Sequence, residues 1–269
     1  MKNNYKIFDS HCHIYPDKIA ARAVQSISEF YDGMPVLDDG TLSGLLKSAE
    51  ISGVDRFVVH SVASEPGRVT AINRFIGDAV SSLHGRIIGL GAMHPDSQDL
   101  DGDILLIKSL GLRGVKMHAD IQRIAIDDPR CMKIYERLEH EKLPVLLHAG
   151  DYRFKLSNPE NMLPVLKTFK NLTVIGAHYG GWSMWEEATK KLAHFENFYV
   201  DTSSTLGFAG FEFVKTLLPK FDPSRILFGT DYPTWDAVQE IEALCALKLS
   251  KQALQGILYN NCAKLYGVE

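Results

Sequence analysis

The sequence predicts a single (β/α)8 barrel, a distorted TIM barrel, over residues 1–269. Short β-rich runs alternate with longer segments of helical period, eight such repeats follow one another, and no break in composition marks a second domain. Strands that alternate with helices form parallel βαβ units, and eight units close into a barrel of about 250 residues. A closed barrel therefore fits the chain better than an open doubly wound sheet.

Each expected strand is a short run rich in β-branched and aromatic residues. The runs are Tyr5–Phe8, Arg56–Val59, Ile87–Leu90, Gly114–Met117, Pro144–Leu147, Thr173–Gly176, Phe198–Val200 and Ile226–Phe228. Helical patterns such as "PRCMKIYERLEHEK" and "NPENMLPVLKTFK" lie between them, and several open with Pro, Asp or Asn, as helices commonly do. A tail helix is expected in "SKQALQGILYNNCAKLYG".

The first connection is the longest. Residues 14–54 contain two helical stretches separated by "YDGMPVLDDG", a cluster of Gly, Pro and Asp that indicates a surface loop. Such an insertion over the barrel mouth is either a lid or only a long loop, and the sequence favours the loop.

Composition excludes several classes of protein. Hydrophobic residues make up 45% of the chain and charged residues 23%, which is enough to build a core. The formal charge of -4 and the scattered basic residues give no stripe for a nucleic-acid backbone. No stretch approaches the roughly 20 apolar residues that cross a bilayer, and "MKNNYKIFDSHCH" lacks the apolar run of a signal peptide. These features predict a cytoplasmic protein without nucleic-acid or membrane partners.

The histidines are concentrated where strands are expected to end. Seven of the ten lie within a few residues of these ends: His11, His13, His60, His94, His118, His148 and His178. The other three fall late in helices, where the helix dipole favours a cation. Because all strands of a parallel barrel end at one face, the seven imidazoles are expected to ring one mouth, together with Lys116, Asp201 and Asp231.

His11 and His13 are separated by one residue in "DSHCH". In an extended strand both side chains point to one side and Cys12 points to the other. Two imidazole nitrogens that converge in this way suit a transition metal, although the spacing alone is weak evidence. The other three cysteines lie far apart in the sequence and form no disulfide framework or zinc knuckle.

Four motifs together resemble the amidohydrolase superfamily. They are "DSHCH" after the first strand, "VLLHAG" after the fifth, "IGAHYGG" after the sixth and "LFGTDYP" after the eighth. They are most similar to the amidohydrolase-related branch, which includes enzymes like aminocarboxymuconate semialdehyde decarboxylase. The resemblance covers nearly the whole chain, with each motif at its own strand end and in the expected order.

The resemblance implies one divalent metal ion per chain, Zn²⁺ or another transition metal such as Mn²⁺. The implied ligands are His11, His13, His148 and Asp231, and the implied catalytic residues are Asp231 and His178. Zinc lowers the pKa of bound water toward about 7 and polarises a substrate oxygen. Asp231 would accept the proton of this water, and His178, beside the ligands, would stabilise an oxyanion or move a proton.

Lys116 has three competing interpretations. Strand alternation places Lys116 and His118 on one face of the fourth strand. In the binuclear branch of the superfamily, a lysine at this strand is carbamylated and bridges two metals, and the histidines of strands five and six bind the second ion. Alternatively, Lys116 binds a substrate carboxylate or pairs with an acid inside the barrel. The motifs favour these last two.

The remaining polar residues at the mouth are weaker candidates. His60, His94 and His118 are more often rim residues than ligands, although His118 is also a candidate for substrate binding. Asp201 is a candidate for orienting a ligating histidine. Arg153, in "GDYRFKLSN", is a candidate for clamping a substrate carboxylate, and a solvated basic loop is the alternative.

The predicted function is a metal-dependent hydrolase that cleaves a C–O or C–N bond in a small, carboxylated substrate. The alternative is a metal-dependent, non-oxidative decarboxylase of a small aromatic or muconate-type acid. A barrel that serves only as a scaffold is the third hypothesis, and it leaves the clustered histidines unexplained. Members of the family are often dimers, so a homodimer is the expected assembly. Neither fold nor ligands identify the substrate.

Overall fold

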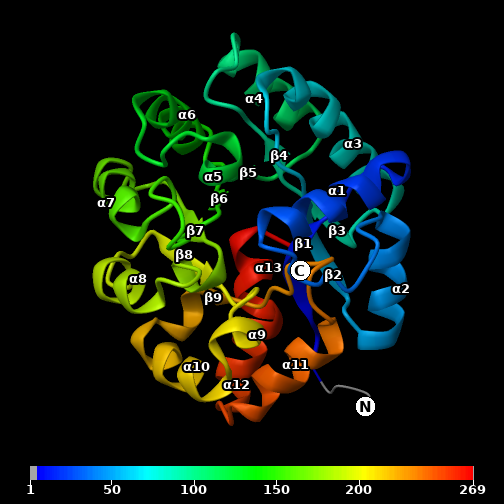
Figure 1. Cartoon of the computed structure of the whole chain (residues 1–269), viewed down its shortest axis with the longest axis vertical. Coiled ribbons are helices and arrows are strands. Elements are labelled where there is room, and N and C mark those ends of the chain that lie inside the picture. The colour runs from blue at the N-terminus through cyan, green and yellow to red at the C-terminus, as the bar shows by residue number, and fades with distance from the viewer. Residues whose placement is uncertain (1–4, 269) are drawn as a thin grey trace.

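The computed structural model describes residues 5–268, whose parallel strands and surrounding helices confirm the predicted (β/α)8 class (Figure 1). The strands form two hydrogen-bonded sheets, in the orders β1-β2-β3 and β4-β5-β6-β7-β8-β9. Their bounds are β1 Phe8–His13, β2 Arg56–His60, β3 Ile87–Gly89, β4 Gly91–Ala92, β5 Val115–Met117, β6 Val145–Leu147, β7 Val174–Gly176, β8 Phe198–Asp201 and β9 Ile226–Leu227.

The third predicted strand is interrupted, which distorts the barrel. The backbone N–H of Leu90 donates to the carbonyl of Val59, next to β2, whereas the N–H of Gly91 donates to the carbonyl of Gly114, next to β5. The first part of this stretch, β3, thus pairs with β2, and the second part, β4, pairs with β5. The strand is divided where the hydrogen bonding changes from one neighbour to the other. The two strands together occupy one of the eight positions in the barrel.

The first strand was expected at Tyr5–Phe8, and this placement is wrong. Strand β1 begins at Phe8 and runs through His13. Backbone hydrogen bonds from Ser10 N–H to Phe228 O (2.8 Å) and from His13 N–H to Tyr232 O (2.7 Å) keep the histidine segment in the barrel wall. These bonds also close the barrel, because they join the first strand to the chain that follows β9.

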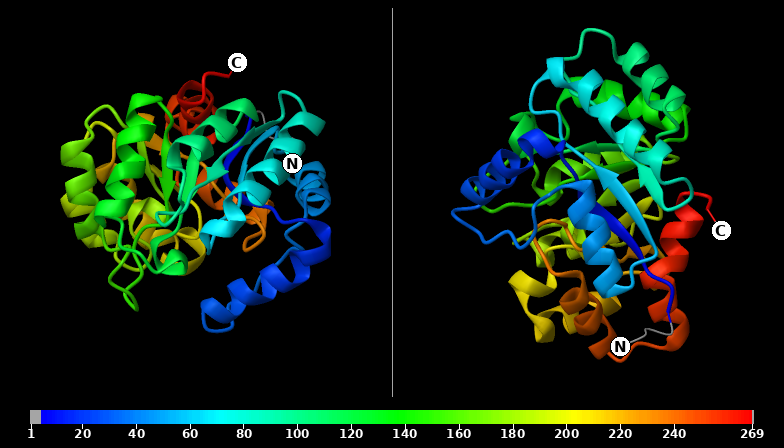
Figure 2. Two further views of the ribbon diagram at one scale, coloured as in Figure 1. Left: turned by 90° about the horizontal axis from the view of Figure 1, so that it is seen from above. Right: turned by 90° about the vertical axis from the view of Figure 1, so that its right-hand side faces the viewer.

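The helices surround the strands in an outer ring (Figures 1 and 2). Helix α6 shows why such segments are helical: Asp128 caps it, a proline occupies its first turn, and every third or fourth side chain is buried. No helix of the described chain is long and apolar enough to span a membrane. The helices are α1 Asp17–Phe30, α2 Leu42–Ser52, α3 Val69–Ser82, α4 Leu100–Ser109, α5 Ala119–Gln122, α6 Pro129–His140, α7 Pro159–Thr168, α8 Trp185–Leu192, α9 Leu206–Ala209, α10 Phe211–Leu217, α11 Ala237–Ala246, α12 Lys251–Gln255 and α13 Asn261–Leu265.

The tail closes one end of the barrel. Helices α12 and α13 are joined by the π-helical turn Gly256–Asn260. Together they form the helical tail that was expected in this stretch. Apolar side chains from the strands form a buried cluster with the tail side chains Tyr259, Cys262, Ala263 and Tyr266. In Figure 2 the tail lies opposite α1, so the two ends of the barrel carry different segments.

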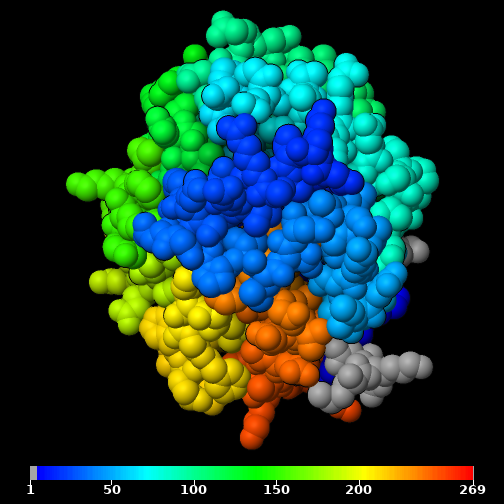
Figure 3. Space-filling model, turned by 45° about the vertical axis from the view of Figure 1, so that its right-hand side comes forward, coloured from blue at the N-terminus to red at the C-terminus, as the bar shows by residue number. Residues whose placement is uncertain are grey.

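The long first connection lies across the other end. It consists of α1, the loop of residues 31–41 and α2, which confirms the two expected helices and the loop between them. Figure 3 shows this segment, in dark and mid blue, crossing the face of the molecule between the cyan and green segments on one side and the yellow and orange segments on the other.

Candidate metal centre

Three side chains at the open end of the barrel meet at one point. Nε2 of His11 lies 3.3 Å from Nε2 of His13 and 3.4 Å from Oδ1 of Asp231, and the last two atoms are 3.5 Å apart. A tetrahedral ion with bonds of about 2.1 Å to nitrogen and oxygen separates neighbouring ligand atoms by about 3.4 Å. The three atoms are therefore spaced like three corners of a tetrahedral metal site.

The protonation of His11 leaves its Nε2 available to a cation. Its Nδ1 lies 2.8 Å from Oδ2 of Asp201, and both side chains are fully buried. Burial raises the pKa of Asp201, but His11 and the hydrogen bonds outweigh this effect and hold that pKa well below its usual range. The ionised carboxylate accepts the Nδ1–H of His11, and Nε2 of the ring faces His13 and Asp231. The residues present thus fit a divalent transition metal.

Asp231 is ionised in the same surroundings. Burial raises the pKa of its carboxyl group, but His11, His178 and His13 lower it more, and the pKa is about 2. The hydroxyl of Ser204 donates to Oδ2 at 2.5 Å, which leaves Oδ1 facing the two histidines. The backbone of Asp231 has a φ of +61°, a left-handed conformation that non-glycine residues adopt mainly where the surrounding structure imposes it.

A second pair of imidazoles lies beside the first group. Nε2 of His178 is 3.2 Å from Nδ1 of His148. Nδ1 of His178 lies 3.1 Å from the carbonyl oxygen of Ser203 and 2.9 Å from its hydroxyl, whose own proton goes to Asp201. Both partners accept, so Nδ1 of His178 carries the proton and its Nε2 carries a lone pair directed at His148.

This arrangement differs from the expected ligand set. His148 was grouped with His11, His13 and Asp231, but its Nδ1 contacts His178 instead. Its buried Nε2 has no hydrogen-bond partner among the described residues and lies 4.0 Å from Oδ2 of Asp120. The histidines are therefore divided between two neighbouring groups of possible ligands.

Lys116 lies between these groups and is fully buried. Its Nζ is 3.3 Å from Nε2 of His11, and no carboxylate of the described chain lies within 4.0 Å of it. Burial lowers the pKa of the amine to about 8, even though Asp201 and Asp231 act to raise it. Among the described residues Lys116 forms no direct ion pair with a barrel acid, and only the more distant charges of Asp201 and Asp231 act on it.

His118 contacts protein groups in this structure, and its expected role in substrate binding stays a prediction. Its Nε2 lies 3.2 Å from the hydroxyl of Tyr31, its Nδ1 accepts from the backbone N–H of Ile121, and its ring stacks on His148 at 3.8 Å. Both nitrogens therefore have protein partners. Asp120, which the sequence did not single out, lies beside these rings, and burial raises its pKa to about 6.

The other two strand-end histidines differ from each other. His94 accepts from the backbone N–H of Asp96 at 3.1 Å, as a rim residue does. His60 is fully buried, and its ring packs edge-on against His11 and His13. Within residues 5–268, neither of its ring nitrogens has a hydrogen-bond partner.

Arg153 is paired with protein groups in this structure, and its expected contact with a substrate carboxylate stays a prediction. Its guanidinium donates to Asp151 and Asp32, in each case at 2.8 Å, and to the carbonyl of Phe30 at 2.9 Å. The hydrogen bonds with Asp151 raise the pKa of the arginine further above its usual value. The positive charge of Arg153 is thus paired with the carboxylates of Asp151 and Asp32.

A small pocket opens above the two ligand groups. Sequence reasoning did not identify most of its walls, because they come from loops far apart in the chain. About 10 Å³ of open space remains in it. The lining residues are Tyr31, Met34, His148, His178, Trp182, Ser204, Phe208 and Asp231.

The fold and the site define a metal-dependent class of barrel enzyme. A family model described as amidohydrolase matches residues 8–268, nearly the whole chain, and the chain belongs to this family. The family is metal-dependent, and the solved structures with a similar fold include both decarboxylases and hydrolases. No curated protein matches the chain.

Several solved structures share the fold at low sequence identity. An uncharacterized TIM-barrel protein from Bordetella bronchiseptica is 19% identical, with a TM-score of 0.76 over 97% of this chain and 98% of its own. A 5-carboxyvanillate decarboxylase from Novosphingobium aromaticivorans, complexed with manganese, is 14% identical, with a TM-score of 0.72 over 99% and 97%. A 2-pyrone-4,6-dicarboxylic acid hydrolase assigned in Pseudomonas putida is 17% identical, with a TM-score of 0.69 over 98% of both chains.

Proposed function

We propose that the protein is a metal-dependent hydrolase that cleaves a C–O or C–N bond of a small, carboxylated substrate. One observation carries this proposal: two groups of ligand atoms lie side by side, His11, His13 and Asp231 in the first and His148 and His178 in the second. Paired metal sites are typical of hydrolytic enzymes, in which they bind the attacking and the leaving oxygen. The substrate is proposed as a small molecule because the pocket is small.

The proposed centre differs from the single ion expected from the motifs. His11, His13 and Asp231 would hold one cation, and His148 and His178 would hold a second. The donor set of imidazoles and a carboxylate suits zinc or manganese, and one solved neighbour contains manganese. When bound, the cations would act as Lewis acids and make a water molecule acidic at neutral pH.

Lys116 is proposed to bridge the two positions as a carbamate. Its buried amine has no carboxylate within 4.0 Å in the described part of the chain, and its pKa near 8 leaves part of it neutral at pH 7 to 8. A neutral amine attacks the carbon of CO2, the N–C bond forms, and the nitrogen releases one proton. The product carries the negative charge that two adjacent cations require. A lysine that holds a substrate carboxylate is the alternative.

Asp231 and His178 are given distinct roles. The ionised Asp231 would accept the proton of the attacking water and pass it to the leaving group, while Ser204 orients its carboxylate through Oδ2. His178 cannot donate a hydrogen bond to an oxyanion from Nε2, because its proton is on Nδ1. The tautomer therefore supports His178 as a ligand rather than as a general acid.

A decarboxylase is the second candidate. The aromatic walls of the pocket, Tyr31, Trp182 and Phe208, favour a flat aromatic substrate, and the fold neighbours include a decarboxylase of a substituted aromatic acid. In this case the same centre would hold the substrate and a protein group would protonate the ring carbon after CO2 leaves.

One screen separates the candidates. Purified protein, stripped with a chelator and reloaded with Zn²⁺ or Mn²⁺, would be assayed for acid release from carboxylated lactones and amides and for CO2 release from hydroxybenzoates. We expect metal-dependent acid release. Metal-dependent CO2 release alone would support the decarboxylase, and no turnover together with no bound metal would support a scaffold.

A further inference from the structure

The loop after α1 forms one wall of the pocket. Tyr31 and Met34 line the space above the ligand groups. The ring of Tyr31 packs against Trp182 at 5.5 Å and lies 6.3 Å from the ring of His148, and its hydroxyl reaches His118. A segment from the first connection thus closes a site whose possible ligands come from the strands, in agreement with its position across the barrel face in Figure 3.

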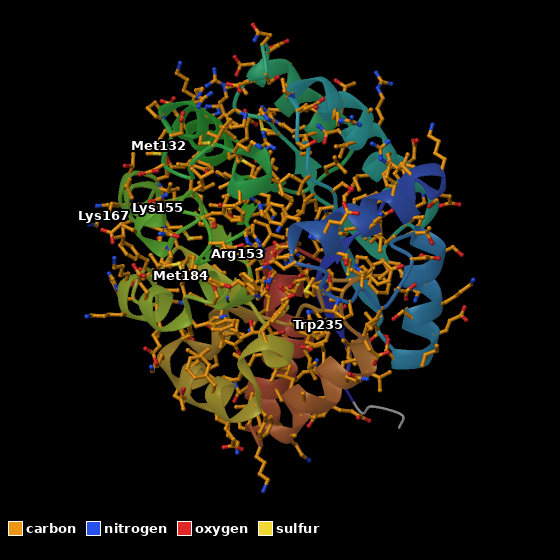
Figure 4. The ribbon with its side chains drawn as sticks, viewed as in Figure 1. Met132, Arg153, Lys155, Lys167, Met184 and Trp235 are labelled. Carbon is orange, nitrogen blue, oxygen red and sulfur yellow. The ribbon has the colours of Figure 1, made fainter. Side chains whose placement is uncertain are left out.

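Arg153 joins this wall to the loop after β6. On its own loop, its Nε and Nη2 donate to the carboxylate of Asp151, which is fully buried. On the other side, its Nη1 donates to the carbonyl of Phe30 and to Asp32, the residues on either side of Tyr31. In Figure 4, Arg153 lies near the centre of the barrel face, whereas Lys155 and Lys167 lie toward its outer edge.

Aromatic rings surround the same guanidinium. It lies 5.1 Å from the ring centre of Tyr31 and 5.6 Å from that of Trp182, two of the pocket walls, and the rings of Phe30 and Phe154 are at similar distances. Cation–π contacts of this kind are strongest where water is excluded, and only 17% of the Arg153 side chain is exposed. The cation therefore orders both walls at once.

We propose that Arg153 is a positioning residue that holds Tyr31 over the metal-ligand groups, so that the wall of Tyr31 and Met34 determines which substrates enter by their size. We call the bonds from Arg153 to Asp151, Asp32 and the Phe30 carbonyl the Arg153 clamp. The substrate part of this inference rests on the proposed function, whereas the clamp itself does not.

The two halves of the clamp differ in strength. Asp151 is buried, so removing its partner would leave an uncompensated charge. Asp32 is 80% exposed, and exposed ion pairs contribute little. Because only about 10 Å³ is open, a substrate enters only after the wall moves. The weaker half, at Asp32, is where the clamp opens.

The test compares Asp32→Asn with the wild-type protein. Asparagine tolerates the left-handed φ of +56° at this position, so the variant removes only the charge. The matched control is Asp101→Asn, which weakens an exposed ion pair with Arg137 that lies outside the pocket. In Asp32→Asn we expect the rate of hydrogen exchange in residues 30–41 to rise about threefold or more. We expect the same rise in the rate at which 1,10-phenanthroline removes Zn²⁺, and no change in melting temperature.

Tyr31→Ala tests the selection by size. With substrates from the screen described above, it is expected to raise kcat/KM for bulkier substrates relative to smaller ones, with the metal content unchanged. Two results together would overturn the proposal. In the metal-loaded Asp32→Asn variant, hydrogen exchange and Zn²⁺ release would occur at the rates of the Asp101→Asn control, and the Tyr31→Ala variant would keep the wild-type preference between bulky and small substrates. A chain that binds no metal but shows faster exchange in Asp32→Asn would contradict the proposed function and support the clamp.

Discussion

Nδ1 of His11 and Oδ2 of Asp201 are 2.8 Å apart in a fully buried pair that connects strand β1 to strand β8. The same carboxylate accepts the backbone N–H of His178 through its other oxygen, at 3.0 Å. One side chain thus fixes the ring orientation of a candidate ligand in the first group and the backbone of a candidate ligand in the second.

Replacing Asp201 with asparagine should weaken metal binding. The amide cannot hold His11 as firmly in the tautomer that has a free Nε2, and the loss of such partners lowers metal affinity by about 10- to 100-fold. Competition with a fluorescent zinc chelator measures the effect, and Asp101→Asn serves as the surface control. Unchanged affinity in Asp201→Asn would show that the pair is only structural.

Single ligand substitutions should separate one ion from two. His11→Ala removes a corner of the first group and is expected to abolish tight binding there, whereas His178→Ala is expected to lower the metal content by one ion and to keep the first ion. Elemental analysis of the purified variants reads out both values, with His140→Ala as an exposed control. A wild-type content of one ion, unchanged in His178→Ala, would restore the single-ion site predicted from the motifs.

Glu240 should make stability fall as the pH rises. Burial raises its pKa from 4.5 to about 8, so between these values the folded protein holds a proton that the unfolded chain has released. The free energy of unfolding therefore decreases with pH across this window, by up to about 1.4 kcal/mol per pH unit.

The variant Glu240→Gln keeps the shape of the side chain and removes the titration. Urea unfolding at pH 5 and pH 8 should show that the variant gains stability relative to wild type at pH 8 and not at pH 5. Glu242→Gln, on the exposed side of the same helix, is the control. Equal shifts in both variants would mean that Glu240 is not the source.

Gly150 should tolerate no side chain. It has a φ of +76°, and a Cβ there would lie 2.5 to 2.6 Å from backbone atoms of Gly181 and Trp182. We expect Gly150→Ala to destabilise the protein by about 1 to 3 kcal/mol in urea unfolding. Gly53→Ala is the matched control, because Gly53 has a similar φ of +78° in open space. Equal losses of unfolding free energy in the two variants would show that the contacts with Gly181 and Trp182 do not contribute to the effect.

The sequence predicted the positions of those candidate site residues that strand geometry alone places at the barrel mouth. His11, His13, Lys116, His148, His178 and Asp231 all end or follow parallel strands, and such ends converge in a closed barrel. The division of the histidines into two groups could not be predicted, because it depends on ring orientations set by Ser203 and Asp201. Strand alternation placed Lys116 inside but said nothing of the missing acid partner.

The loops limited the rest of the prediction. Arg153 looked like a substrate clamp because its partners, Asp32 and Phe30, lie more than a hundred residues away, in a connection whose path the sequence does not determine. The bounds of β1 were missed for a related reason. The residues after Phe8 read as polar, and they stay in the wall through backbone bonds to residues 228 and 232, which a pattern of side chains does not reveal.

Anomalous diffraction from crystals grown with Zn²⁺ or Mn²⁺ tests the central claim most directly, since it locates the ions themselves. The account predicts one peak about 2.0 to 2.2 Å from Nε2 of His11, Nε2 of His13 and Oδ1 of Asp231, and a second peak within coordination distance of Nδ1 of His148 and Nε2 of His178. Fully loaded crystals without a peak among His11, His13 and Asp231 would contradict it.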